Sequence, residues 1–380
     1  MAKLGEVCKV SPSTKNIERQ GAWLLNLDMV EQQTGRVIEY KYVGEDDLNG
    51  SIIQFDTENV LYSKLRPNLN KVVLPQKDGF STSELLPLRP DASVLNKDYL
   101  AVFLRSDSFV TWAVSKTAGA KMPRLGTKDL MNAEIPVPSI EQQKKIAEKF
   151  KKLEQLISLR KQQLAKLDEL VKARFVEMFG DCKTNPKNWK TKALEKIANV
   201  GSSKRVFVEE LQDSGIPFYR GTEIGALAEK KAVKPELFIT EEHYKQLCET
   251  TGKPQKGDLL MPSICPDGRI WIVDTDEPFY FKDGRVLWVH LTSSDYNSVF
   301  LLYTLKDRIM TDYASIASGT TFAELKIFAL KKCKVFDVPL ELQNQFAAFV
   351  ERADQQKQTV QQSLEKLELL KKALMQEYFG

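Results

Sequence analysis

The stretch KLDELVKARFVEMFG, at residues 166–180, occurs a second time as KLELLKKALMQEYFG at residues 366–380. The two copies are 200 residues apart without a gap, and eight of their fifteen positions are identical. Similarity at a fixed offset is the signature of an internal repeat. The sequence therefore predicts a chain built from two related halves, each of which ends in this motif.

Each copy of the motif closes a segment that we expect to form one long helix. The segments open after Pro138 and Pro339, and neither contains another Pro or a Gly before Gly180 and Gly380. Helices commonly stop at a glycine. At about 1.5 Å per residue, about forty helical residues would span about 57 Å.

Apolar residues recur at 4-3 spacing along both segments, which is the pattern of a heptad seam. The first copy carries the seam at Ile146, Phe150, Leu153, Ile157, Leu164, Leu167, Val171 and Met178. In the second copy the same register gives Phe346, Val350, Ala353, Val360, Leu364, Leu367, Leu374 and Tyr378. Both segments therefore present an apolar stripe to a partner.

Interruptions of the seam indicate that the two helices pair with each other. Copy one has Arg160 and Arg174, and copy two has Lys357 and Lys371, at positions where the other copy is apolar. Two unlike helices that pair explain this difference better than two helices that each self-associate. In an antiparallel pair, Arg160 would lie near Leu364 and Arg174 near Val350. The alternative is an amphipathic helix buried on each of two separate globular domains.

Length and composition restrict the class of protein. A chain of 380 residues predicts two or three domains, and its 42% apolar content supports packed cores. No apolar run approaches the roughly twenty residues of a membrane span, and residues 1–7 lack the hydrophobic region of a signal peptide. Five scattered cysteines without a Cys-x-x-Cys pair predict a reduced cytoplasmic protein without structural zinc. A net charge of +4 restricts nucleic-acid binding to localised patches.

The sequence lacks the common catalytic motifs. Two histidines in the whole chain, His243 and His290, argue against a histidine-based metal or acid/base site. There is no phosphate loop, no Gly-rich turn for dinucleotides or S-adenosylmethionine, and no Asn/Asp-Pro-Pro-aromatic stretch for base methylation. The Pro-Asp pairs at residues 90–91 and 266–267 lack a convincing Glu-x-Lys nuclease partner. We expect no catalytic activity, no metal and no cofactor in this chain.

Further repeats divide the chain into four segments. The segment Tyr99–Arg105 recurs as Phe300–Lys306, and Val137-Pro138 recurs as Val338-Pro339, each at an offset of 201. We therefore expect globular domains at 1–138 and 183–338, and long helices at 139–182 and 339–380.

Each globular domain is predicted to be α+β, with a partly antiparallel sheet and a few flanking helices. One helix is expected in each, at Asp98–Ser115 and at Asn297–Ala317. The expected strands are Val37–Val43, Ser51–Phe55, Lys71–Leu74 and Glu84–Leu88, then Asp258–Met261, Ile270–Val273, Phe279–Phe281 and Val286–Leu291.

Loops rich in basic, amide and hydroxyl side chains are the candidate binding residues. Residues 63–71 and 262–269 form a Pro-stiffened turn in each domain, and residues 117–124 and 318–321 form a second loop of small residues. Arg and Lys suit phosphates and guanine edges, and Asn suits adenine. The candidates are Lys64, Arg66, Asn68, Asn70, Lys121, Arg124, Lys204, Arg205, Arg220, Arg269, Thr320 and Thr321. The alternative for each loop is a solvated turn, and for residues 201–205 a plain linker.

Several motifs resemble the specificity subunits of type I restriction-modification enzymes. IPVPSIEQQKKIA at residues 135–147 is similar to the family's helix entry, Pro-Leu-Pro-x-x-Glu-Gln-x-x-Ile-Ala. IPFYRGTEI at 216–224 resembles the family's early strand with its following Gly-Asp-Ile, and residues 80–90 and 258–261 also match. Residues 338–346 depart from the helix-entry pattern, and residues 25–28 are a degenerate copy of the 216–224 motif. The resemblance covers essentially the whole chain.

The resemblance implies a specific function. Each globular domain would be a target recognition domain that reads one half of a split, asymmetric site in double-stranded DNA. The two helices would pair antiparallel as a spacer between the half-sites. Methylation and ATP-driven cleavage would belong to partners, namely two modification subunits and the restriction subunits, which would use S-adenosylmethionine, ATP and Mg. Alternatives from other classes are a coiled-coil adaptor with two duplicated protein-binding domains, and a self-contained nuclease.

Overall fold

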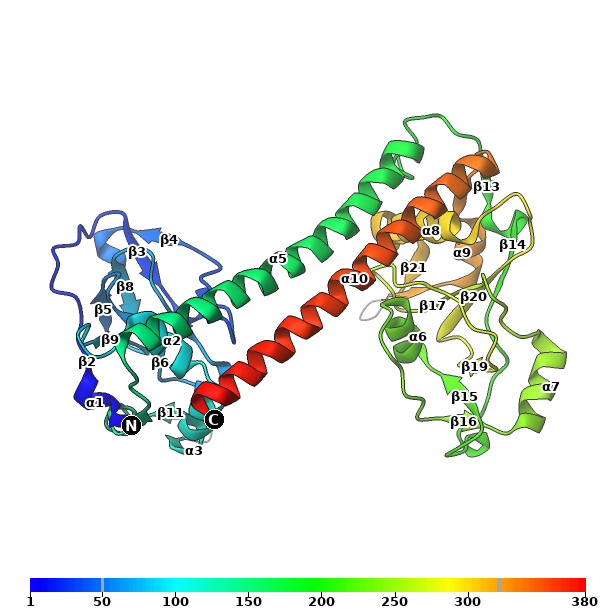
Figure 1. Ribbon diagram of the computed structural model, residues 1–380. Helices are drawn as coiled ribbons and strands as arrows, with labels where there is room; N and C mark the ends of the chain where they lie inside the picture. Colours follow the sequence, from blue (N-terminus) through cyan, green and yellow to red (C-terminus); the bar gives the residue numbers. More distant parts are fainter. Residues whose placement is uncertain (49–50, 120, 320–322) are drawn as a thin grey trace. The chain divides into compact units, whose positions relative to one another are not determined.

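The computed structural model describes residues 1–48, 51–119, 121–319 and 323–380 (Figure 1). Its contacts divide the chain into two compact units, which we call unit 1 (residues 1–163 and 360–380) and unit 2 (residues 164–359). Each unit contains one globular domain and parts of two long helices. Those helices, α5 (Ile140–Phe179) and α10 (Leu340–Phe379), are each 40 residues long. The prediction of two long helices is confirmed.

Within unit 1, α5 and α10 pack antiparallel. Glu154 and Lys371 form an ion pair of 2.9 Å, and Lys161 and Glu368 one of 3.3 Å. The Arg160 Nε donates to the Ser363 hydroxyl at 3.2 Å, which agrees with the predicted position of Arg160 near Leu364. The seam residues Phe150 and Leu364 are buried.

Within unit 2, the other ends of the two helices also pack against each other. Phe175 and Phe346 make an edge contact with ring centroids 5.4 Å apart. The Arg174 guanidinium lies 5.8 Å from the centroid of Phe349, the residue next to its predicted neighbour Val350. Lys357 pairs with Asp168 at 2.5 Å. The antiparallel pairing expected from the seam is therefore present in each unit.

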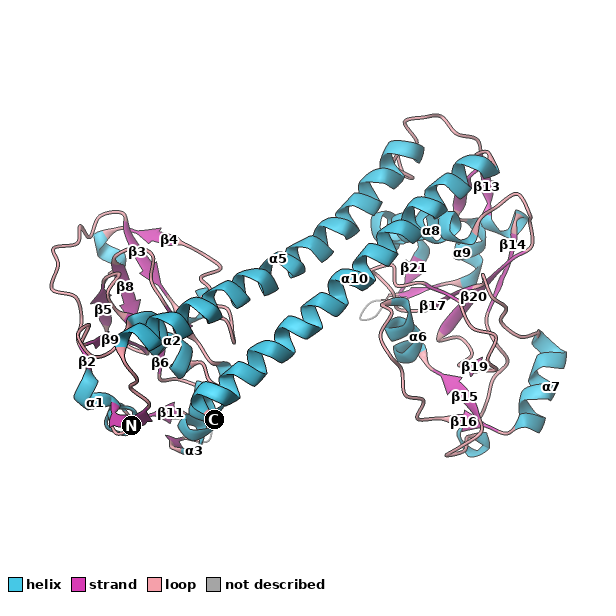
Figure 2. Ribbon diagram, viewed as in Figure 1, coloured by secondary structure: helices cyan, strands magenta, loops and turns pink. Residues whose placement is uncertain are grey.

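Two four-stranded sheets form the globular domain of unit 1 (Figure 2). The first has the order β2-β9-β6-β7 and is antiparallel, and the second has the order β4-β3-β8-β5 with a parallel β3–β8 pair. The strands are β1 (Ala2–Lys3), β2 (Cys8–Val10), β3 (Ala22–Leu25), β4 (Lys41–Val43), β5 (Ile52–Phe55), β6 (Val60–Ser63), β7 (Val72–Val73), β8 (Gly79–Thr82), β9 (Leu85–Pro90), β10 (Thr117–Ala118), β11 (Arg124–Leu125) and β12 (Glu134–Ile135). The short helices are α1 (Leu4–Val7), α2 (Lys97–Leu104), α3 (Asp107–Ser115) and α4 (Thr127–Met131).

The single helix predicted at 98–115 is in fact two helices. The Ser106 hydroxyl accepts from the Phe109 backbone N–H at 3.3 Å, which caps α3 and separates it from α2. Arg105, between the two helices, donates to the Val72 carbonyl at 2.7 Å and reaches Glu154 of α5 at 3.5 Å. Arg105, placed at the break between α2 and α3, therefore connects the globular domain to the long helix α5.

The globular domain of unit 2 repeats this arrangement. Its antiparallel sheet has the order β14-β20-β17-β18, and a second sheet, β16-β15-β19, again contains a parallel pair, β15–β19. The strands are β13 (Thr191–Ala193), β14 (Ala198–Gly201), β15 (Ile216–Tyr219), β16 (Phe238–Ile239), β17 (Leu259–Pro262), β18 (Trp271–Ile272), β19 (Tyr280–Phe281), β20 (Val286–Leu291), β21 (Ala317–Ser318), β22 (Glu324–Leu325) and β23 (Lys334–Phe336). The helices are α6 (Gly221–Ala228), α7 (Glu241–Thr251), α8 (Ser298–Ile316) and α9 (Ile327–Lys332).

The apolar cores include the ends of the long helices. In unit 1, Met375 and Phe379 of α10 join Phe150 in the core under α2. In unit 2, Phe175 and Phe179 of α5 join the core under α8. The C-terminal end of each long helix is therefore a structural part of a globular core as well as of the helix pair.

Candidate nucleic-acid interface

The structure joins the two candidate loops of unit 1 into one surface. The Arg66 backbone N–H donates to the Pro123 carbonyl at 2.8 Å, and the Leu125 N–H donates to the Lys64 carbonyl at 2.9 Å. Leu65 and Arg124 form a β-bridge. Because these bonds extend β6 alongside β11, the loops 63–71 and 117–124 meet at what we call the unit 1 junction.

The loop 63–71 turns sharply because two residues adopt left-handed backbone conformations. Arg66 and Asn70 both have φ of 50° and flank a short 3-10 turn, Pro67–Leu69. Arg66 and Asn68 are exposed, whereas Asn70 is buried and its amide donates to the Arg105 carbonyl at 3.0 Å. The structure thus places Asn70 at the base of the loop, and leaves Arg66 and Asn68 at its surface.

Several cations of this junction are free to meet an anion. Within the described residues, Lys64, Arg66 and Lys121 have no carboxylate partner. Arg124 pairs with Glu84 at 3.2 Å, with 47% of the Arg124 side chain exposed against 24% for Glu84. The junction is therefore a small positive surface, suited to phosphate oxygens and guanine edges.

The same backbone frame recurs in unit 2. The Ser263 N–H donates to the Arg285 carbonyl at 2.9 Å, and the Leu325 N–H donates to the Ser263 carbonyl at 2.7 Å. In unit 1, the Lys64 N–H donates to the Glu84 backbone carbonyl at 3.1 Å, and the Leu125 N–H donates to the Lys64 carbonyl as described above. We call the second frame the unit 2 junction. The candidates Thr320 and Thr321 lie outside the described residues.

Arg220 and Arg269 are engaged by acidic neighbours. Arg220 pairs with Glu223 at 2.5 Å and Glu236 at 2.9 Å, and its backbone N–H also caps α6 through Glu223. Hydrogen bonds to these carboxylates raise the pKa of Arg220. Burial opposes ionisation of Glu223, but hydrogen bonds from Arg220 outweigh it and lower the Glu223 pKa to about 2. Arg269 pairs with Asp267 at 2.8 Å.

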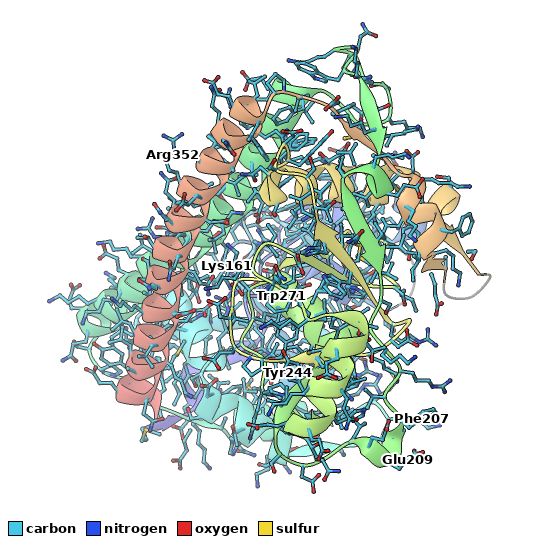
Figure 3. The ribbon with its side chains drawn as sticks, turned by 90° about the vertical axis from the view of Figure 1, so that its right-hand side faces the viewer. Lys161, Phe207, Glu209, Tyr244, Trp271 and Arg352 are labelled. Carbon is cyan, nitrogen blue, oxygen red and sulfur yellow. The ribbon has the colours of Figure 1, made fainter. Side chains whose placement is uncertain are left out.

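Lys204 and Arg205 lie next to the turn between β19 and β20. The Ser202 hydroxyl donates to the Val286 carbonyl at 2.6 Å and accepts from the Gly284 N–H at 2.9 Å. Arg205 stacks on Phe207, with 5.1 Å between the guanidinium carbon and the ring centroid. Phe207, labelled in Figure 3, is half exposed at the edge of the domain. The turn is therefore tied to Ser202, and the Lys204 N–H donates to the Tyr280 hydroxyl of β19 at 3.0 Å.

Arg285 is a residue that sequence reasoning missed. It pairs with Glu324 and is 56% exposed, whereas the Glu324 side chain is 26% exposed. Only the repeat offset of 201, which aligns Arg285 with Glu84, could have singled it out.

The described chain also contains cysteine thiols and residue types that can bind metal ions. Burial raises the pKa of the Cys8 and Cys265 thiols to about 12, so neither is a thiolate nucleophile near neutral pH. Within the described ranges, no group of three His, Cys, Asp or Glu residues could hold a metal ion. Among the helices described, none is long and apolar enough to cross a bilayer.

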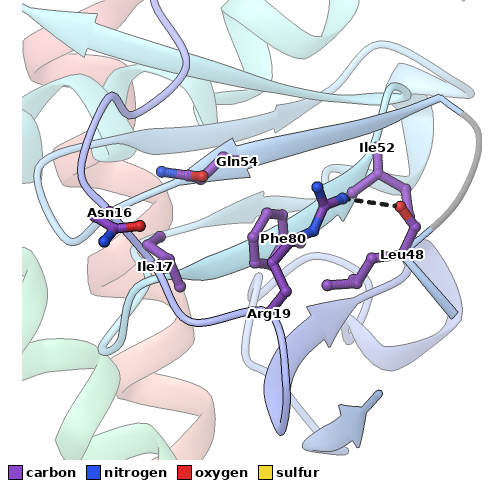
Figure 4. Close-up of a pocket in the computed structure, with 7 residues that line it drawn as sticks. All are labelled: Asn16, Ile17, Arg19, Leu48, Ile52, Gln54 and Phe80. Atoms are coloured by element: carbon purple, nitrogen blue, oxygen red, sulfur yellow. Dashed lines mark hydrogen bonds between the residues drawn. The ribbon is translucent and has the colours of Figure 1, made fainter. Parts of the chain in front are cut away.

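A cavity of about 440 Å³ lies on the second sheet of unit 1 (Figure 4). It is lined by Asn16, Ile17, Arg19, Leu48, Ile52, Gln54 and Phe80. Arg19 donates to the Leu48 carbonyl at 3.3 Å and lies 5.9 Å from the Phe80 ring centroid. None of the candidate binding residues lines this cavity, so it is separate from the junction.

The family model and the similar proteins all indicate one family. The model of the type I restriction modification DNA specificity domain matches twice, at residues 1–169 and 186–369. The MjaIX specificity subunit of Methanocaldococcus jannaschii is 24% identical, with 92% of this chain and 84% of the relative covered. The EcoDI specificity subunit of Escherichia coli is 27% identical over 124 residues, which are 33% of this chain and 27% of that protein.

Solved structures show the same fold. The type I restriction-modification S subunit from M. genitalium aligns with a TM-score of 0.59 and 15% identity, covering 100% of this chain and 95% of that one. A chain from a structural study of the assembly of a type I R-M system aligns with a TM-score of 0.62 and 18% identity, covering 100% and 96%. With the family model matched twice over most of the sequence, this chain belongs to the type I restriction-modification DNA specificity family.

Proposed function

We propose that this chain is the non-catalytic specificity subunit of a type I restriction-modification enzyme. It reads a bipartite, asymmetric DNA site and directs partner methyltransferase and restriction subunits to that site. The observation that carries the proposal is the duplicated loop junction, which recurs on one backbone frame in both domains of a chain of this family. Family membership supports DNA specificity, and the duplicated frame supports two reading surfaces.

The asymmetry of the site follows from the side chains on that frame. Lys64 of unit 1 corresponds to Ser263 of unit 2. Each donates its N–H to the residue before β9 or β20, and each accepts at its carbonyl from the equivalent strand, β11 or β22. Glu84 and Arg124 likewise correspond to Arg285 and Glu324. Different donors and acceptors on one frame select different bases, so each unit reads its own half-site.

The long helices act as the spacer, and the partners supply the chemistry. In this proposal α5 and α10 fix the gap between half-sites, and two modification subunits and the restriction subunits assemble on this chain. S-adenosylmethionine, ATP and Mg belong to those partners.

The proposal is tested by gel shift of random-sequence duplex at low salt, with the purified chain alone and with its methyltransferase partner. Duplex binding that strengthens with the partner is expected. If the complex binds no duplex, the protein is instead an adaptor with two protein-binding domains. Metal-dependent cleavage by the chain alone would mean a nuclease.

Substitution of Arg66 tests the reading surface of unit 1. Because its guanidinium is exposed and has no carboxylate partner in the described chain, Arg66→Ala should cost about 1–3 kcal/mol of binding and relax one half-site only. Sequencing of methylated sites in cells with the complete system measures this. An unchanged motif and an unchanged affinity would remove Arg66 from the reading surface.

A further inference from the structure

The ion pairs at the two junctions have opposite polarity on the same backbone frame. In unit 1 the residue before β9 is Glu84 and the first residue of β11 is Arg124, and the two form an ion pair. In unit 2 the residue before β20 is Arg285 and the first residue of β22 is Glu324, and these also pair. In both units the residue that follows a strand, Lys64 after β6 or Ser263 after β17, lies between the paired residues. Its N–H donates to the carbonyl of Glu84 or Arg285, and its carbonyl accepts from Leu125 or Leu325.

The fold does not explain this reversal. A cross-strand ion pair between partly exposed side chains stabilises a frame equally well in either polarity, and it contributes little in either case. The two junctions show that the frame accepts both arrangements. The position of the arginine is therefore free to serve another purpose.

In both pairs the arginine is the more accessible partner. Arg124 is 47% exposed against 24% for Glu84, and Arg285 is 56% exposed against 26% for Glu324. A carboxylate behind the guanidinium fixes its orientation, because arginine has five N–H donors in a rigid plane. The donors that the carboxylate leaves unused can pair bidentately with a phosphate or a guanine edge.

Each arginine lies at an exposed turn or loop of its own junction. Arg124 lies on the loop that joins Lys64 and Arg66, two cations with no carboxylate partner in the described chain. Arg285 follows Gly284 in the turn before β20, and the Gly284 N–H donates to the Ser202 hydroxyl at 2.9 Å. Arg124 therefore lies beside other cations of unit 1, and Arg285 is an exposed cation on the unit 2 frame.

We propose that Arg124 and Arg285 are the DNA-contacting arginines of the two junctions, and that Glu84 and Glu324 are positioning residues that orient them. This inference rests on the proposed function. It names Arg285 as a recognition residue and assigns the reversed polarity to the difference between the two half-sites.

Double variants with the two charges of an ion pair exchanged test whether the position of the arginine matters independently of the net charge. Glu84→Arg with Arg124→Glu, and Arg285→Glu with Glu324→Arg, keep the ion pair and the net charge but move the guanidinium to the other strand. Arg285→Ala removes it. Lys256→Ala is the matched control, because Lys256 is an exposed, carboxylate-paired cation before the opposite end of β17. Thermal unfolding of each full-length variant checks the fold.

Two measurements are made on the chain with its methyltransferase partner. For Arg285→Ala, affinity for duplex DNA that carries the motif methylated by the wild-type complex should fall about fivefold to 150-fold. The slope of log affinity against log salt concentration, measured between about 50 and 200 mM salt, should become smaller in magnitude by about one. Each swapped variant should keep the salt slope and lose specificity in one half-site, read by sequencing of methylated sites. Lys256→Ala should match the wild type.

The outcomes distinguish this inference from the proposed function. If wild type binds duplex and methylates a split motif, but all variants keep affinity and motif, the ion pairs are structural only and the inference is overturned. The same holds if a swapped variant weakens both half-sites equally. If wild type binds no duplex, the proposed function itself fails.

Discussion

Two buried glutamines join the long helices to the globular domains. Gln143 accepts from the Asn96 N–H at 2.8 Å and donates to the Val94 and Pro138 carbonyls, each at 2.8 Å. Gln343 makes the equivalent bonds in unit 2, to Asn297, Asp295 and Val338. Both side chains are fully buried. Each amide therefore fixes the start of a long helix against the loop that precedes α2 or α8.

Replacement of Gln143 by Leu should destabilise unit 1. Leu fills a similar volume but leaves the Asn96 N–H and two carbonyls without partners, and an unsatisfied buried group costs about 1–3 kcal/mol. Urea unfolding of Gln143→Leu measures the loss, with the exposed Gln162→Leu on the same helix as control. Equal stability of the two variants would show that the amide bonds contribute nothing.

Acid should weaken unit 2 through Glu223. Its pKa is about 2 in the folded protein and 4.5 in an ordinary environment, so the folded state favours the carboxylate. That stabilisation is complete above about pH 4.5 and is lost as the pH falls toward 2. Thermal unfolding from pH 6 to pH 2.5 should therefore show a shallower decline for Glu223→Gln than for wild type. Parallel declines would contradict the account.

At this scale the sequence identified residue types better than their partners. It selected Arg66 because basic residues on a Pro-stiffened loop suit DNA, and Arg124 because a basic residue on a loop of small residues can reach a phosphate. It could not tell that Asn70 is buried, or that Arg220 pairs with two carboxylates. Glu236 is 16 residues from Arg220 in the chain, so this pairing depends on the fold.

At the scale of elements, the ends of the long helices contribute to the domain cores, in addition to the helix pairing that the seam provides. The heptad pattern predicted both long helices and their antiparallel register, because period and interruptions are local features. It did not include Phe175, Phe179 or Phe379, which lie off the seam and enter the domain cores.

Truncation of Phe179 tests this role. The Phe179 ring is fully buried and lies 4.8 Å from the Phe300 ring centroid. Phe179→Ala should cost about 3–5 kcal/mol, as expected for a large core side chain. The exposed Leu369→Ala should change stability by less than about 0.5 kcal/mol. Denaturant unfolding compares them, and a small loss for Phe179→Ala would mean that the helix end is not part of the core.

Among the shorter helices that were not predicted, α6 and α7 were missed for different reasons. Helix α6 contains Gly221 and Gly225, and glycine disfavours helices, so its formation depends on the Arg220–Glu223 cap and on burial of Ile224. Helix α7 had a readable signal, because the Thr240 hydroxyl caps it. The eight predicted strands, which are β-rich runs bounded by turn residues, each overlap a strand of the structure, but strands such as β3, β6 and β8 were missed. The parallel β3–β8 and β15–β19 pairs depend on long-range contacts.

At the scale of the whole molecule, the repeat predicted the architecture. Offsets of 200 and 201 matched two sheets of equivalent strand order, two junction frames and two glutamine contacts. The two junctions present different side chains on that common frame, and the second sheets differ, with four strands in unit 1 and three in unit 2. A duplicated scaffold with different surfaces is what a reader of an asymmetric split site requires.

We propose that the helix pair sets the distance between half-sites. Four residues inserted after Gln163 in α5 and four after Thr359 in α10 lengthen both helices by about 6 Å. DNA advances about 3.4 Å per base pair, so the gap should grow by one or two base pairs. A control replaces four residues at each place without a change in length.

The decisive measurement is sequencing of methylated sites in cells that express the insertion variant with its partner subunits. We expect the two wild-type half-sites, unchanged in sequence and separated by one or two additional base pairs. Methylation at the original spacing would contradict it, because the helices would then not determine the gap.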